Sequence, residues 1–179
     1  MKNLTKFLAC TVLIVLSVSC QQQDLKPNAV LDELSVSENL RNYGAHLSAP
    51  DGVESQGQGQ AIFRFSKDGT ELYYKLIVAN IENIIMAHIH LRADAQTPNG
   101  PPVLWLIPDG PPPLLTPVTT NGVLVEGTVT EANLVGPLSG ASIAMLKDKI
   151  REGLTYVNVH TTANRGGEIR GGIKPNMKK

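Results

Sequence analysis

From residue 39 onward, apolar and polar side chains alternate along short runs that turn residues separate. Residues 61–65 and 71–78 show the alternation most clearly, and Lys67-Asp68-Gly69-Thr70 between them is typical of a hairpin turn. A period of two places successive side chains on opposite faces of a strand, so that one face can be buried. Several short strands with intervening turns favour an antiparallel β-sandwich. Further strands are predicted at residues 84–91, 103–107, 123–130, 156–161 and 168–173.

A helical period appears clearly in one segment only. Residues 141–152 place Ile143, Leu146 and Ile150 on one helix face, and Gly153 can end the helix. The sequence therefore predicts an all-β fold with one short helix.

Composition bounds the size of the protein and its class of partner. A length of 179 residues suits one domain, and sixteen glycines with twelve prolines suit a fold rich in turns. Lys+Arg and Asp+Glu each count 16, so the formal net charge is zero. Proteins that bind nucleic acids normally carry a basic surplus or stripe, so we expect no nucleic-acid partner.

The first 19 residues have the pattern of a secretory signal peptide. Lys2 and Lys6 flank the start of an apolar run that extends from residue 7 to residue 18, and Cys10 lies inside it. The run is too short for a transmembrane helix, which needs about 20 apolar residues. We therefore predict that residues 1–19 are removed.

The segment Leu16-Ser17-Val18-Ser19-Cys20 resembles the cleavage box of bacterial lipoproteins, although Ser17 stands where the box usually has Leu. The resemblance implies that Cys20 is acylated and anchors the protein to a membrane of the bacterial cell envelope, on its periplasmic face or at the cell surface. An ordinary signal peptide that happens to contain a cysteine is the alternative. Residues 20–38 are then a polar tether, residues 39–174 the folded domain and residues 175–179 a tail.

Three histidines are the strongest candidates for a binding site. His88 and His90 lie two apart in a predicted strand and share one face with Met86, while alternate apolar residues form the opposite, core face. His160 lies opposite the valines of a later strand and also faces outward. If the two strands are adjacent, three imidazoles converge on the outer face of the sheet. Copper and zinc both favour imidazole nitrogen, and copper is the better candidate because Met86 could add a soft fourth ligand.

Other interpretations of these residues remain open. A His-x-His pair in a strand is most often solvated or hydrogen-bonded, and no pattern shows that the two strands are adjacent. His46 has no spacing partner and is interpreted as a structural or surface residue. Glu168 and Arg170 share a face in the last strand, either as an ion pair or with Glu168 orienting a ligand histidine. No catalytic motif is recognised, so no residue is assigned a catalytic role.

Three passages resemble the CHRD domain, the module named after chordin. They are Ala87-His88-Ile89-His90, the run from Val123 to Leu138, and Val157-Asn158-Val159-His160-Thr161 with the later Gly167-Glu168-Ile169-Arg170-Gly171. The resemblance spans roughly residues 40–173. It implies a Greek-key-like sandwich of the immunoglobulin or superoxide-dismutase type in an extracytoplasmic protein.

A second, local resemblance links His88, His90 and His160 to the copper ligands of copper–zinc superoxide dismutase, which lie in a His-x-His strand and a later strand. No bridging histidine, zinc-ligand set or loop disulfide accompanies them. The leading hypothesis is therefore a lipid-anchored CHRD-domain binding protein with a metal site, and enzymatic activity is left open. A metal-free module that binds a protein or glycan, and a dismutase-like redox enzyme, are the two alternatives.

Overall fold

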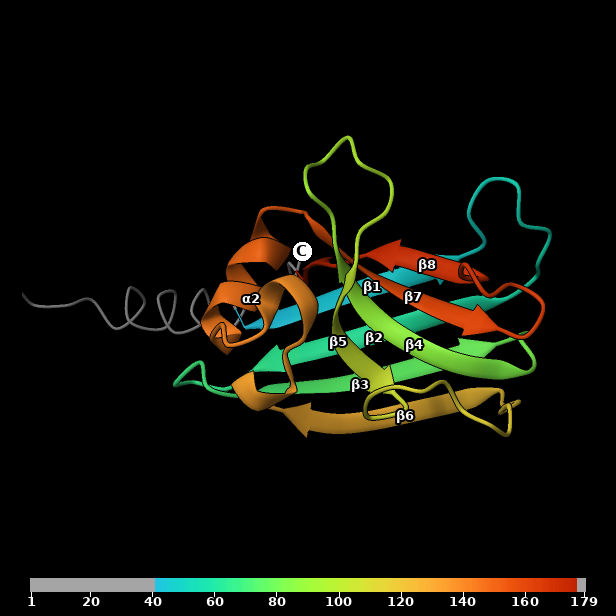
Figure 1. The fold of residues 1–179 in the computed structure, drawn as a ribbon, viewed down its shortest axis with the longest axis horizontal. Helices are drawn as coiled ribbons and strands as arrows, with labels where there is room; N and C mark the ends of the chain where they lie inside the picture. The colour runs from blue at the N-terminus through green and yellow to red at the C-terminus, as the bar shows by residue number, and fades with distance from the viewer. Residues whose placement is uncertain (1–40, 177–179) are drawn as a thin grey trace, which may run out of the picture.

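The computed structural model describes residues 41–176, and they fold around an antiparallel β-sheet of nine strands (Figure 1). One α-helix and two short 3₁₀ helices complete the described fold. The predicted all-β fold with one short helix is confirmed. In chain order the elements are β1 (Asn42–Ser48), β2 (Gln58–Phe65), β3 (Leu72–Ala79), β4 (Ile84–Leu91), β5 (Pro102–Ile107), β6 (Gly122–Val129), η1 (Glu131–Asn133), η2 (Gly136–Leu138), α2 (Ile143–Arg151), β7 (Thr155–Thr161), β8 (Ile169–Gly172) and β9 (Lys174–Pro175).

The sheet curls on itself until it is almost a closed barrel. Its strand order is β5-β4-β7-β8-β1-β2-β3-β6, and β9 pairs with β1 beside this path. One half, β5-β4-β7-β8, faces the other half, β1-β2-β3-β6, as the two layers of a sandwich do (Figure 1). The two ends of the sheet approach each other: the hydroxyl of Tyr74 in β3, the strand beside edge strand β6, donates to the Leu106 carbonyl of edge strand β5 at 3.0 Å. The strand order still ends at β5 and β6, so within the described residues the barrel is not closed by a ladder between these two strands.

The core lies between the two halves and is built by the alternation seen in the sequence. Along β3, buried residues alternate with half-buried ones, and the side chain of Leu76 is completely buried. Helix α2 closes one end of the barrel with three buried side chains, Ile143, Leu146 and Ile150. Its first turn is capped by Ser142, whose hydroxyl accepts a hydrogen bond from the Met145 N–H at 3.3 Å.

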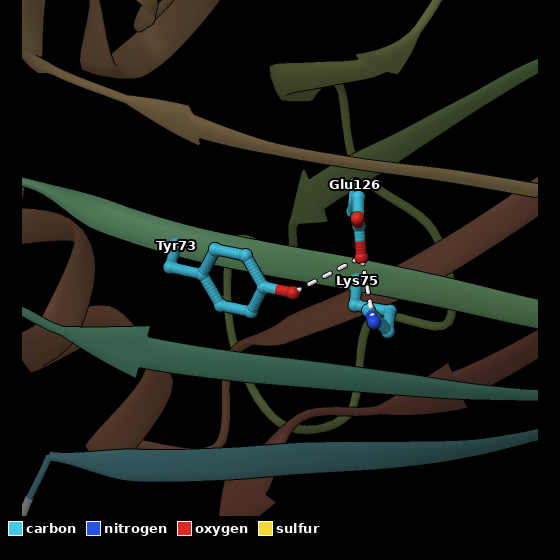
Figure 2. A network of polar contacts seen from close by, with 3 residues as sticks. All are labelled: Tyr73, Lys75 and Glu126. Atoms are coloured by element: carbon cyan, nitrogen blue, oxygen red, sulfur yellow. Dashed lines mark hydrogen bonds and ion pairs between the residues drawn. The ribbon is translucent and has the colours of Figure 1, made fainter. Parts of the chain in front are cut away.

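The outer surface of β3 and β6 carries an exposed polar network. Figure 2 shows Glu126 of β6 accepting a hydrogen bond from the Tyr73 hydroxyl at 3.2 Å and pairing with the Lys75 ammonium at 2.6 Å. These residues bridge two neighbouring strands at the surface. These contacts and the surrounding solvent account for the polar side chains on this face of β3 and β6. Within the described residues, the candidate metal-binding group does not include any member of this network.

The described residues, 41–176, lie almost entirely within the predicted domain of residues 39–174. The sheet continues slightly further than expected, because β9 brings Pro175, which was expected to begin the tail, opposite Tyr43. The predicted signal peptide, Cys20 and the whole of the tether lie outside the described residues. Within residues 41–176, no helix is long and apolar enough to cross a membrane.

Candidate metal centre

The three histidines come together because β4 and β7 are neighbours in the sheet. The antiparallel register places Met86 opposite His160, and His88 opposite Asn158. Residues that face each other across a strand pair point to the same side of the sheet. The condition left open by the sequence is therefore met, and the three imidazoles share one small area of the sheet.

The imidazoles are buried, which differs from the solvated outer face that the sequence suggested. They lie on the face opposite the barrel core, as expected, but His88, His90 and His160 are only 3%, 8% and 5% exposed. Neighbouring loops and aromatic side chains cover them. Periodicity identifies the face of a strand, but it does not show which distant segments cover that face.

Two loops hold the rings by backbone carbonyl groups. The Nδ1–H of His90 donates to the Gly100 carbonyl at 2.7 Å, and the Nδ1–H of His160 donates to the Arg165 carbonyl at 2.8 Å. Because a carbonyl can only accept, these bonds place the proton on Nδ1 in both neutral rings. The Nε2 atom of His90 then carries a lone pair without a hydrogen-bond partner in the described residues, while the Nε2 lone pair of His160 faces His88.

The interior of the cluster lacks enough partners for its nitrogens. His88 Nδ1 lies 3.3 Å from His160 Nε2, while the Nε2 atoms of His88 and His90 are buried with no hydrogen-bond partner among residues 41–176. One nitrogen from each ring lies within 4.8 Å of the others. Unpartnered buried polar atoms are costly, so this arrangement suits a group that the three nitrogens would bind together. The donor set fits a metal ion that prefers imidazole.

Burial also fixes the charge of the rings. It opposes protonation and lowers the pKa of His88 to about 3, with a further contribution from the neighbouring His160 and His90. Burial likewise lowers the pKa of His90 and His160, although the carbonyls of Gly100 and Arg165 act in the opposite direction. All three rings are therefore neutral at neutral pH, which is the state that binds a metal.

Aromatic side chains form the walls of the cluster. Trp105 of β5 meets the His88 ring edge to face, with centroids 4.1 Å apart. The Tyr156 ring stacks on His90 at 5.0 Å, and the Arg92 guanidinium lies 4.7 Å from the centre of the Tyr156 ring. Tyr156 could have been found from the sequence, because it lies in the same strand phase as His160. Trp105 could not, because its neighbour in the sheet was unknown.

Glu168 and Arg170 differ from both interpretations made from the sequence. The Glu168 carboxylate accepts hydrogen bonds from Ser55, Thr161 and Asn164, and within the described residues it contacts neither an imidazole nor Arg170. Burial raises the pKa of Glu168, but these three bonds together outweigh it and lower the pKa. Backbone carbonyls, rather than Glu168, hold the histidine rings.

The remaining candidate residues, Arg170, Met86 and His46, differ in their neighbours and in their exposure. Arg170 is directly across from Asn158 and donates to the side chain of Asn99 at 2.9 Å. Met86 is half-buried and adjoins His160 through the register, so its position allows the expected role. His46 is exposed on β1, in agreement with its interpretation as a surface residue.

The fold and the cluster together define an all-β barrel with a buried group of three neutral histidines on its outer wall. A comparison with protein families matches residues 43–173 to the CHRD domain, which covers nearly all of the barrel. The chain therefore belongs to the CHRD-domain family. Comparison with curated proteins and with solved structures finds no match.

Proposed function

We propose that this CHRD domain binds a single metal ion through His88, His90 and His160. The observation that carries the proposal is the pair of buried Nε2 atoms without partners, in a cluster whose nitrogens lie within 4.8 Å of one another. Copper is the better candidate and zinc the second, because imidazole suits both and the thioether of Met86 favours copper. The residues carry no assigned catalytic role, so the activity proposed is binding.

The proposal places this binding domain outside the cytoplasm. The apolar run of residues 7–18 and the box that ends at Cys20 support secretion followed by lipid attachment. In this arrangement residues 20–38 tether the barrel to a membrane of the bacterial envelope. A metal site in such a protein would capture ions from the envelope compartment.

Metal analysis of residues 31–179 tests the proposal, because this fragment contains every strand of the barrel. The fragment is made without a histidine tag, loaded separately with Cu(I), Cu(II) and Zn(II), desalted and analysed for bound metal. A variant with His88, His90 and His160 replaced by Ala is compared with a His46→Ala control, whose histidine is exposed on β1. We expect about one metal ion per chain in the parent and the control, as a three-ligand site requires.

The triple variant is expected to retain no metal while it keeps the far-UV spectrum of a β protein. Circular dichroism of each sample distinguishes the loss of ligands from the loss of fold. Equal retention by the parent and the triple variant, or no retention by the parent, would reject the metal proposal.

An interaction module is the second candidate, favoured by one surface feature. The proline-rich loop between β5 and β6 presents Leu115 with 95% of its surface exposed. A large apolar side chain so exposed in a loop is an available contact for a protein or glycan partner. If a protein or glycan partner still binds after the three histidines are replaced, the function would be assigned to this loop surface.

A further inference from the structure

In the part of the chain that the structure describes, the three-histidine group offers a bound cation no negatively charged ligand. Among residues 41–176, the group of potential ligand atoms within 4.8 Å of one another comprises the three histidines alone, with no carboxylate. All three rings are neutral ligands. A bound metal ion would therefore keep its full charge inside a site whose ligands are less than one-tenth exposed.

Two arginines contact or face residues that surround the cluster, one step removed from the imidazoles. Arg92 lies over Tyr156, whose ring stacks on His90, and Arg170 faces Asn158 in the register next to His88. Neither guanidinium forms an ion pair in the part of the chain that the structure describes.

Burial makes the charge of the ion decisive. The cost of moving an ion from water into a medium of low dielectric grows with the square of its charge, so a dication pays roughly four times the cost of a monocation of similar size. A carboxylate ligand would normally offset that difference. Imidazole and thioether groups cannot, but they do suit a soft monovalent metal.

We propose that the site selects a monovalent, soft metal ion, Cu(I), over Cu(II) and Zn(II). This selectivity rests on the proposed metal-binding function, because it concerns the same three histidines. Met86 is paired with His160 in the register of β4 and β7, so its thioether is the soft donor that the proposal assigns to the ion. The neutral donor set leaves the second charge of a dication uncompensated in this buried site, which disfavours Cu(II) and Zn(II) relative to Cu(I).

The test compares four ions on the fragment of residues 31–179. Cu(I), handled without oxygen, and Ag(I), a second soft monovalent probe, are each measured by competition with a chelator of known affinity. Cu(II) and Zn(II) are measured in the same way. Two variants, Met86→Glu and Met86→Gln, have nearly the same shape and differ by one negative charge.

We expect the parent to bind Cu(I) and Ag(I) more tightly than Zn(II) and Cu(II). Met86→Glu should bind Zn(II) more tightly than Met86→Gln, on the order of tenfold or more, since a carboxylate close to the ion supplies the missing negative charge. Cu(I) affinity should fall in both variants, because both remove the thioether.

Two results would overturn the selectivity while leaving the binding function in place. One is a parent that holds Zn(II) or Cu(II) at least as tightly as Cu(I), and the other is equal Zn(II) affinity in the two Met86 variants. A parent that retains none of the four ions would instead reject the proposed function itself, and the selectivity with it.

Discussion

At the scale of single residues, the buried histidines should make the metal-free domain sensitive to mild acid. In the unfolded chain these rings titrate near their ordinary pKa of 6.5, whereas the pKa of His88 in the fold is lowered to about 3. Between these values the unfolded chain binds more protons than the folded one. The free energy of unfolding should therefore fall as the pH drops below about 6.5. Urea unfolding of the metal-free fragment at about pH 7.5 and about pH 5 measures this change.

Two single variants separate the cluster from the rest of the molecule. His160→Gln removes one buried ring that resists protonation, so the loss of stability between the two pH values should become smaller. His46→Gln alters an exposed ring and should leave the loss unchanged. A parent whose urea midpoint is the same at both pH values would contradict the expected burial of neutral rings.

The same residues show how far a sequence can predict this site. From the period-two alternation, His88, His90 and His160 were predicted to lie on the face of the sheet opposite the core, and in the structure they come together on that face. Their burial was not predictable, because it depends on Gly100 and Arg165, whose carbonyls arrive from loops with no periodic pattern. Glu168 was misinterpreted for the same reason, since one of its hydrogen-bond partners, Ser55, lies far away in the chain.

At the scale of elements, the turn between β7 and β8 should control the metal site. Gly167 has a φ of 119°, and a Cβ atom there would lie 2.1 Å from the Asn158 side-chain oxygen. Gly167→Ala should therefore displace Asn158 and the turn that carries the Arg165 carbonyl. We expect a loss of stability of about 1–3 kcal/mol, together with weaker metal retention.

The adjacent glycine provides a matched control for this prediction. A Cβ atom at Gly166 meets nothing within 4 Å, so Gly166→Ala should leave the urea midpoint and the metal content nearly unchanged. The two variants are compared by urea unfolding and by metal analysis after desalting. Equal behaviour of the two would show that the turn does not position His160.

Elements also differ in how well the sequence predicts them. Strand β4 occupies residues 84–91 as predicted, because alternation there is long and its core face is uniformly apolar. Strand β9 was missed, since Lys174 and Pro175 are exposed and carry no alternation of their own. It forms only because the neighbouring edge of β1 is available to it, which is a property of the tertiary fold.

At the scale of the whole molecule, the barrel and the metal cluster use opposite faces of the same strands. The core side chains Ala87 and Ile89 of β4 point inward, between the histidines that lie on the outer wall. Helix α2 closes one end of the barrel and supplies none of the three imidazoles (Figure 1). The ligands can therefore be exchanged without removing core side chains, which makes the proposed variants informative about binding rather than folding.

The predicted lipid anchor is a property of the full chain and can be tested with its two cysteines. Cys20→Ser removes the acylation site, while Cys10→Ser alters a residue inside the segment predicted to be removed. In a bacterial host that is fed a labelled fatty acid, the parent and Cys10→Ser should be labelled and partition with membranes. Cys20→Ser should lose the label and the membrane association, because each buried CH₂ of an acyl chain contributes about 0.8 kcal/mol to anchoring. A Cys20→Ser protein that still carries the label, or a parent without it, would contradict the lipoprotein prediction and leave the proposed metal site on a barrel without this tether.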